Sequence, residues 1–219
     1  MNDILKTAGR SGNVGSIYSE TFESYVSLPA MTNKSTFSIN LHAYSIESLR
    51  YGSPSGTGNL MAGFFNAPLN SMRFRINGAV SLYYDYPNDE VISISTFNHL
   101  LTWNSYTLVY DGINLIYYVN SEEAVRVETI QTPVPFDLIL GKWGFGYHVK
   151  GNKSHVSCFN RVLNTNEIKL LSQGLPISRQ GLVGEWKLNE MSGTTAYDTS
   201  GQGNHGTIVG ATYSTEKPF

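Results

Sequence analysis

Carboxylate pairs are the first candidates for chemistry in this chain of 219 residues. Glycoside hydrolysis needs two carboxyl groups on either side of one sugar, about 5 to 9.5 Å apart. Two adjacent pairs, Asp89–Glu90 and Glu122–Glu123, point their members to opposite faces of any strand. Glu185 and Glu190 are five residues apart, an odd number that again separates the faces. No Ser/His/Asp arrangement with a local signature and no phosphate-binding glycine loop appears, so the sequence predicts that the protein is not an enzyme.

Aromatic clusters are the second group of candidates, because sugar recognition combines aromatic faces with amide and hydroxyl partners. One cluster precedes the turn YPND, and the other lies in the loop GKWGFGYH. The candidate ligand-binding residues are Tyr83, Tyr84, Tyr86, Trp143, Tyr147 and His148. Aromatic residues anchor protein interfaces equally well, and Trp143 with Phe145 could also cover an open end of the core. The sequence leaves glycan binding and protein docking open.

Alternation of apolar and polar residues predicts the strands that must position these side chains. The clearest is 36–44, with Phe37, Ile39, Leu41 and Ala43 on one face and Ser38, Asn40, His42 and Tyr44 on the other. Trp103 and Trp186 lie on other alternating strands, so we expect both in the core. The dipeptide Asp111-Gly112 between two apolar runs predicts a two-residue hairpin.

One short helix is expected near residues 165–172. Asn164 can cap it, and Glu167 three residues later completes the pattern of a capping box. Ile168, with the leucines at 170 and 171, would face inward, and Gly174 would end the helix.

The composition excludes several classes of partner. Fifteen basic against seventeen acidic residues give a formal charge of −2 without a basic run, so no nucleic-acid binding is expected. No apolar run approaches the ~20 residues of a membrane span, so no membrane insertion is expected. Residues 1–16 lack the apolar core of a signal peptide. Cys158 is the one cysteine and is expected to be a buried small residue.

Four parts of the chain together resemble one protein family. They are SETFESYVSLP with STFSINLHA, then WNSYTLVYDGINLIYYVNSE, then NRVLNTNEIKLL, and finally GLVGEWKLNEMSGTTAYDTSGQGNHGT. Over nearly the whole chain they resemble motifs of laminin-G-like domains in the concanavalin A-like lectin/glucanase superfamily. His42 stands where the family usually has tryptophan, and Ser121 where it has glycine. The last motif normally opens the family's domain, so the order here is rearranged.

The resemblance implies an all-β fold, a jelly-roll β-sandwich of two antiparallel sheets with the one short helix. Residues 1–16 would form an N-terminal arm and residues 17–219 a single sandwich. Residues 181–212 would complete that sandwich in cis, as a circular permutation, because domain termini often lie close together. The alternative is that they complete the sandwich of a neighbouring subunit in a homo-oligomer.

The resemblance also implies that a structural calcium ion could be bound, as in many related jelly rolls. Calcium takes six to eight oxygen ligands, and the loop DTSGQGNHG could supply Asp198, Asn204 and a glycine carbonyl. The alternative is an Asx-type turn in which Asp198 caps its own backbone. No other cofactor is expected.

Laminin-G-like domains usually act outside cells, whereas this chain begins at Met1 without an export signal. We therefore expect a non-enzymatic recognition module in the virion of a tailed bacteriophage, as a capsid decoration or tail protein. Its partners would be other virion proteins and cell-surface glycans. One alternative is a free-standing carbohydrate-binding lectin, with a cytoplasmic location. A glycoside hydrolase is disfavoured because no strand carries a carboxylate pair.

Overall fold

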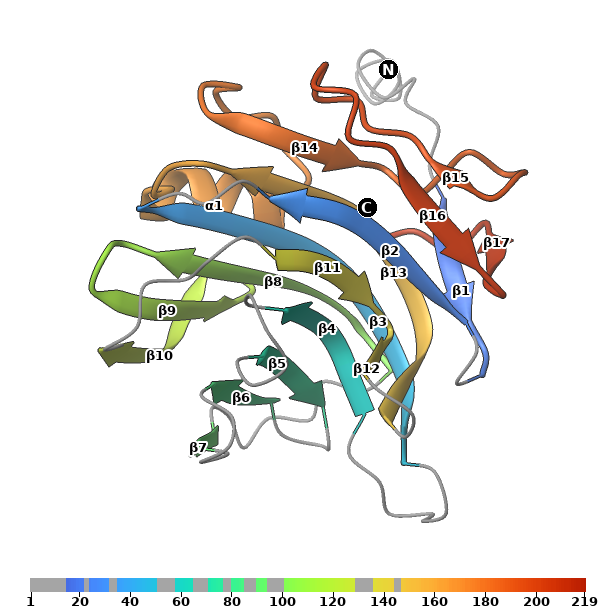
Figure 1. Cartoon of the computed structure of the whole chain (residues 1–219), viewed down its shortest axis with the longest axis horizontal. Coiled ribbons are helices and arrows are strands. Elements are labelled where there is room, and N and C mark those ends of the chain that lie inside the picture. The colour runs from blue at the N-terminus through green and yellow to red at the C-terminus, as the bar shows by residue number, and fades with distance from the viewer. Residues whose placement is uncertain are drawn as a thin grey trace, which may run out of the picture.

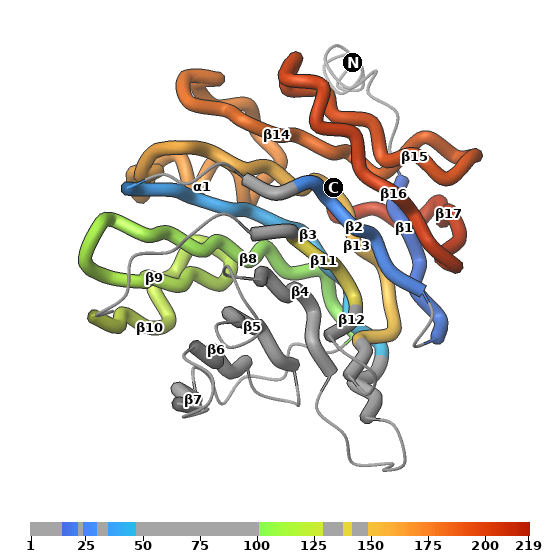
Figure 2. Tube along the Cα trace, in the orientation of Figure 1, coloured from blue at the N-terminus to red at the C-terminus, as the bar shows by residue number. Residues whose placement is uncertain are grey.

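Two antiparallel sheets packed face to face and one short helix make up the protein in the computed structural model (Figure 1). The structure describes residues 15–21, 24–31, 35–50, 58–64, 71–76, 80–84, 90–93, 101–128, 136–143 and 147–219. Figure 2 follows the chain from the N-terminal strands to the C-terminal stretch. The predicted all-β sandwich with a single helix is confirmed for this part of the chain.

The nine-stranded sheet has the order β10-β9-β8-β3-β13-β1-β17, and β12 and β14 each pair with β13. Its strands are β10 (Glu122–Glu128), β9 (Asn114–Val119), β8 (Trp103–Tyr110), β3 (Phe37–Arg50), β13 (Tyr147–Phe159), β1 (Ser16–Ser19), β17 (Thr212–Ser214), β12 (Lys142–Trp143) and β14 (Leu182–Trp186). The long strands β3 and β13 form its centre, so most of the sheet is built on their register.

The eight-stranded sheet has the order β15-β16-β2-β11-β4-β5-β6-β7. Its strands are β15 (Thr195–Ala196), β16 (Gly206–Val209), β2 (Tyr25–Met31), β11 (Phe136–Leu140), β4 (Gly58–Phe64), β5 (Ser71–Ile76), β6 (Val80–Tyr84) and β7 (Glu90–Ser93). Side chains from β2, β11 and β16 meet those of β3, β8 and β13 in the main core.

The predicted alternation of apolar and polar side chains along β3 is confirmed for its apolar face. Phe37, Ile39, Leu41 and Ala43 are at most 4% exposed and lie in the core between the sheets. Ser38, Asn40, His42 and Tyr44 occupy the outer face of the nine-stranded sheet. The first three of these are also buried, which the sequence did not indicate, because other parts of the chain cover this outer face.

The helix α1 (Thr165–Ser172) covers part of the outer face. A second apolar cluster lies beneath it, formed by Val109, Ile116, Tyr118, Phe159, Leu163, Ile168 and Leu182. The predicted capping box is confirmed: Asn164 Oδ1 accepts from the Glu167 amide at 3.0 Å, and Glu167 Oε2 accepts from the Asn164 amide at 3.0 Å. At the other end Gly174 has a φ of +69° and the amides of Gly174 and Leu175 donate to the carbonyls of residues 171 and 170, closing a Schellman motif.

The C-terminal stretch contributes strands to both sheets. Trp186 on β14 pairs with Val156 on β13, whereas Ile208 on β16 pairs with Val26 on β2. The Trp186 ring is 1% exposed, as predicted, and its indole nitrogen donates to the carbonyl of Asn204 at 2.8 Å. Gly184 makes room for this ring, because a Cβ at residue 184 would overlap the indole.

Two sequence expectations need correction in the hairpin after β8. Trp103 is half-buried on the outer face and does not belong to the core, because it pairs with the outward-facing Tyr44. The turn between β8 and β9 has three residues, since β8 ends at Tyr110 and β9 begins at Asn114. Asp111 closes this turn by accepting from the amide of Asn114 at 2.7 Å. In the part of the chain that is described, no helix is long and apolar enough to cross a membrane.

We expect the sandwich to be completed in cis, so light scattering of the full chain should give the mass of a monomer. Deleting residues 181–219 should abolish cooperative thermal unfolding, because both sheets would lose strands that bury the core. An oligomer that dissociates into folded monomers after the deletion would instead establish exchange of the C-terminal stretch between subunits.

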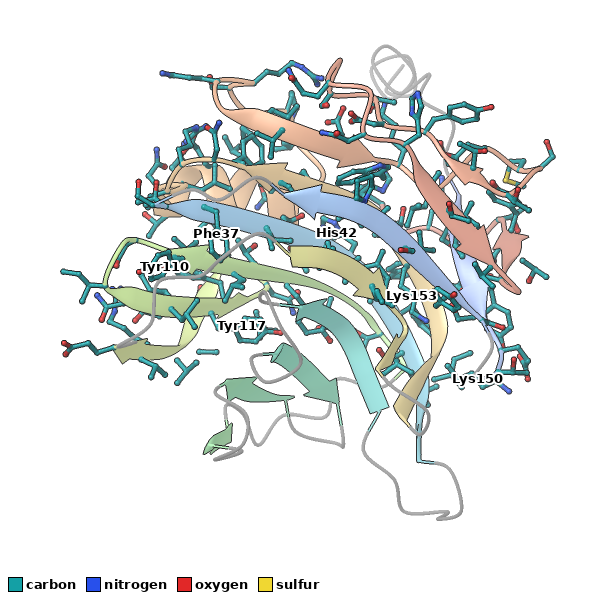
Figure 3. All side chains as sticks on the ribbon, viewed as in Figure 1. Phe37, His42, Tyr110, Tyr117, Lys150 and Lys153 are labelled. Carbon is teal, nitrogen blue, oxygen red and sulfur yellow. The ribbon has the colours of Figure 1, made fainter. Side chains whose placement is uncertain are left out.

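Lys153 is an ionisable side chain in the core, fully buried on the inner face of β13 (Figure 3). Its Nζ donates to the carbonyls of Val149 at 2.6 Å and Gly151 at 3.0 Å. Burial lowers the pKa of Lys153 to about 7, from 10.5. Between these two values the unfolded chain binds more protons than the folded chain, so stability from this group rises with pH.

We therefore expect Lys153→Met to flatten the pH dependence of unfolding between pH 7 and pH 8.5. The native Lys153 contributes a slope of up to about 1.4 kcal/mol per pH unit in that window. Urea denaturation of both proteins across the window measures the difference. If the unfolding free energies of the two proteins had equal slopes against pH, the Lys153 amine could not be buried and uncharged in this window.

Candidate functional site

A row of side chains crosses the outer face of the nine-stranded sheet. Adjacent strands bring Thr212 opposite Tyr18, Tyr18 opposite Asn152, Asn152 opposite Tyr44, and Tyr44 opposite Trp103. Because neighbouring strands are ~4.8 Å apart, five strands place these groups along roughly 19 Å of surface. The row therefore offers three aromatic rings in line, with an amide between two of them.

This row forms the floor of an open groove of about 630 Å³, which we call the outer groove. Its other lining residues are Ile46, Tyr213, Ser214, Glu216 and Lys217. The rings of Tyr44 and Trp103 have centroids 5.9 Å apart and planes inclined at 54°. Tyr18, Tyr44 and Trp103 are each half-buried, so they are supported by the sheet while part of each side chain remains accessible.

Asn152 supplies polar groups at the centre of the row. Its side chain is only 4% exposed, and its Oδ1 has no hydrogen-bond partner among the described residues. Its Nδ2 makes one long contact, 3.5 Å from Ser214 Oγ. An unpaired buried amide oxygen is costly, by about 1 to 3 kcal/mol, and a ligand hydroxyl or amide that donated to it would recover that cost.

An ion pair lies at the margin of the groove, beside Tyr18. Lys150 Nζ lies 2.7 Å from Glu20 Oε1. Burial, and then the hydrogen bond and charge of Glu20, raise the pKa of Tyr18 above its ordinary value. The phenol O–H of Tyr18 is thus used by Glu20, which holds the ring in place at the margin of the groove, and what the side chain offers a ligand is its aromatic face.

None of the six site residues predicted from the sequence is among the described lining residues of the outer groove. Tyr83 and Tyr84 lie on β6 of the eight-stranded sheet, away from the outer groove in the fold. Trp143 on β12 lies opposite Tyr147 on β13, and His148 opposite Lys142. Tyr86 and the side chains of all these predicted residues lie outside the described residues. Their part in binding stays a prediction.

Sequence reasoning missed the residues of the outer groove. Tyr44 was correctly placed on the outward face of its strand, and this was the signal available for the groove. The alternation of its strand places Trp103 in the core, and no sequence pattern marks Tyr18 or Asn152 as site residues. Their alignment depends on the registers of β1, β3, β8 and β13, which the residue pattern of one strand does not contain.

The glycine-rich loop around Asp198 was the predicted calcium site. Asp198 Oδ1 accepts from the amides of Glu185 at 2.9 Å and Ser200 at 2.8 Å. Its Oδ2 accepts from Ser200 Oγ at 2.7 Å and from the Asn204 amide at 2.9 Å. The Asn204 side chain donates to the Val183 carbonyl at 2.8 Å. Both carboxylate oxygens are thus used within the protein, as in the alternative Asx-type turn.

These contacts do not fit a bound calcium ion well. Asp198 is 8% exposed, and the Asn204 carbonyl already accepts from the Trp186 indole. Within the described ranges no cluster of three or more His, Cys, Asp or Glu could hold a metal ion. Burial acts to raise the pKa of Asp198, but hydrogen bonds from Ser200, Glu185 and Asn204 outweigh it and lower that pKa.

We predict that millimolar calcium and EDTA leave the thermal unfolding midpoint unchanged. Asp198→Ala should cost about 3 kcal/mol, since four donors would lose a charged acceptor. Chemical denaturation of the wild type and the variant, with and without calcium, measures both effects. A rise in the midpoint that calcium causes only when Asp198 is present would establish the metal site.

Comparison with known proteins identifies the fold. No protein-family model matches the sequence, and no curated protein matches it. Among solved structures the chain is similar to a proposed carbohydrate-binding protein from Bacteroides ovatus, with a TM-score of 0.67 and 17% identity over 93% of this chain. The chain spans about 60% of the length of that protein.

Two further structures show the same fold. Domain 4 of the arabinanase AbnA from Geobacillus stearothermophilus, solved with arabinotriose, has a TM-score of 0.54 and 14% identity over 76% of this chain and 84% of that one. Domains LG4-5 of the mouse laminin alpha1 chain have a TM-score of 0.53 and 12% identity over 74% of this chain and 46% of that one. The protein therefore has the jelly-roll sandwich fold of these proteins, as the resemblance implied.

Proposed function

We propose that this chain is a non-enzymatic carbohydrate-binding module whose glycan lies in the outer groove. The observation that carries the proposal is the row of Thr212, Tyr18, Asn152, Tyr44 and Trp103, held in register across five strands. A rigid sheet keeps these side chains in place, which limits the entropy lost when a ligand binds.

The chemistry of the row suits a sugar. Aromatic rings offer apolar faces to the C–H surface of a pyranose or furanose, and the groups between them bind hydroxyls. Asn152 supplies an unpaired amide oxygen, and Tyr18, held by its hydrogen bond to Glu20, supplies an aromatic face. The proposed carbohydrate-binding protein and the arabinotriose complex among the solved structures support the same conclusion, at the level of the fold.

The lining of the outer groove favours binding over hydrolysis. Glu216 is the one carboxylate among its described lining residues, and its side chain is exposed. A glycosidase needs two carboxyl groups close to one bond, one of which must hold a proton near neutral pH. Binding without cleavage is therefore the activity proposed for the groove.

We expect Trp103→Ala and Tyr44→Ala each to weaken glycan binding by about tenfold, equivalent to about 1.4 kcal/mol, because each removes one aromatic face. A glycan array followed by isothermal titration with the best oligosaccharide measures the loss. Tyr197→Ala is the matched control, since Tyr197 is a 54% exposed aromatic residue on the hairpin of β15 and β16.

Equal affinity in the wild type and both groove variants would contradict this site. Release of reducing ends from the bound oligosaccharide would contradict the proposed lack of catalysis. A location on a phage virion stays a prediction from the sequence. On a virion, the same groove would attach the particle to a cell-surface glycan. Binding of the protein to other virion proteins would be measured separately, by pull-down from disassembled particles.

A further inference from the structure

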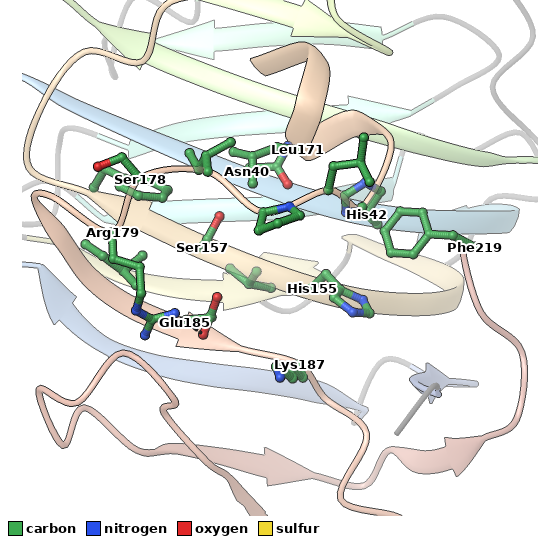
Figure 4. A pocket seen from close by; sticks show the side chains of 17 residues that line it. Asn40, His42, His155, Ser157, Leu171, Ser178, Arg179, Glu185, Lys187 and Phe219 are labelled. Carbon is green, nitrogen blue, oxygen red and sulfur yellow. Dashed lines mark hydrogen bonds and ion pairs between the residues drawn. The ribbon is translucent and has the colours of Figure 1, made fainter. Parts of the chain in front are cut away.

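A second cavity lies on the same outer face, next to the helix. It has a volume of about 330 Å³ and lies between β3, β13 and β14 and the segment 174–179 that follows α1 (Figure 4). We call it the helix pocket. None of its lining residues belongs to the outer groove, so the two hollows are separate. Its volume is at the lower end of the range for pockets that bind small molecules.

The floor of the helix pocket carries buried polar side chains whose hydrogen-bonding capacity is not fully used. His42 is 3% exposed, and neither of its ring nitrogens makes a well-formed hydrogen bond within the described chain, although weaker contacts with the backbone of Ser172, His155 and Leu171 act to raise its pKa. Ser157 is 7% exposed, and its hydroxyl is also unpaired. Both lie on the outer face, where Ser157 pairs with Asn40, two residues before His42 along β3. Leaving such groups unpaired costs about 1 to 3 kcal/mol each, and native proteins rarely do so without a reason.

The electrostatics of the pocket favour a neutral ligand. Burial, and then the nearby charge of His155, lower the pKa of His42 to about 4, so its ring is uncharged at neutral pH. At the other end Arg179 pairs with Glu185 at 3.2 Å, and Thr199 Oγ1 donates to the same carboxylate at 2.6 Å. The charges of Arg179 and Glu185 offset one another, whereas Lys187, which also lines the pocket, is exposed to solvent, so its charge is screened.

The wall of the helix pocket on the side of the helix is apolar. Leu175, Pro176 and Ile177 form the wall on the side of the helix, and Leu171 lies beside them. The Phe219 ring lies edge-to-face against the rings of His42 and His155, with centroid distances of 4.9 Å and 5.2 Å, respectively. A ligand in this pocket would therefore meet apolar surface on one side and hydrogen-bonding groups on the other.

We propose that the helix pocket is a second binding site, for a small neutral ligand that carries hydroxyl groups and has the size of one sugar ring. A neutral imidazole has one donor and one acceptor, and a serine hydroxyl can do both, so paired hydroxyl groups match the floor. This site is independent of the glycan proposed for the outer groove, because it shares no residue with it.

The test uses the full-length chain and a panel of D-glucose, D-galactose, L-arabinose, N-acetylglucosamine, glycerol and sialic acid. Long-range 1H–15N spectra of the histidine rings follow the titration, and His42→Gln identifies the His42 signals. We expect at least one neutral member to shift the His42 ring signals, both in the wild type and in the groove variant Trp103→Ala.

Ser157→Ala should weaken that binding by about tenfold, the effect of losing one hydrogen bond worth roughly 1.4 kcal/mol. The thermal midpoint of this variant should be unchanged or higher, because its hydroxyl has no partner in the protein. Ser172→Ala is the matched control. It also removes a serine hydroxyl, but Ser172 lies on α1, donates to the Lys169 carbonyl and does not line the pocket.

Three outcomes would overturn the proposal: no shift at His42 with any neutral member, a shift with sialic acid alone, or equal affinity in Ser157→Ala and the wild type. Loss of the His42 shift in Trp103→Ala would assign the binding to the outer groove and also overturn it. Glycan binding by the groove is measured separately with oligosaccharides, so either proposal can fail while the other stands.

Discussion

The pairing of β3 with β8 on one side and β13 on the other is the constraint on which the rest of the structure depends. Side chains alternate along a strand. Because the apolar side chains of β3 at 37, 39, 41 and 43 are buried between the sheets, those of Ser38, Asn40, His42 and Tyr44 must lie on the outer face. A shift of one residue in this register would exchange the core and the outer face. Both proposed binding sites are therefore consequences of how the core is packed.

The four outer residues of β3 lie in three different environments. Ser38 lies beside the segment leading to the helix, where its hydroxyl donates to the Arg161 carbonyl at 2.9 Å. Asn40 and His42 line the helix pocket, and Tyr44 lines the outer groove. The helix and the segment after it cover only part of this face, so one sheet surface is divided into an apolar cluster, a partly covered pocket and an open groove.

Local features of the fold could be predicted from the sequence. The capping box at Asn164 and Glu167 depends on residues three apart, and the core position of Trp186 depends on the alternation of its own strand. The sites could not be predicted in the same way. The groove needs the register of five strands. The helix pocket depends on a bulge in β13 between Ser154 and Ser157, with His155 at a φ of +50°. That bulge brings Ser157 opposite Asn40, and no pattern in the sequence indicates it.

Glycan recognition by the outer face of the nine-stranded sheet is tested most directly by a crystal structure of the protein with the oligosaccharide that binds best. We expect sugar rings over Tyr18, Tyr44 and Trp103, with a hydroxyl within hydrogen-bonding distance of Asn152 Oδ1. A sugar held instead at the β12–β13 ribbon around Trp143, or on the eight-stranded sheet at Tyr83, would contradict it.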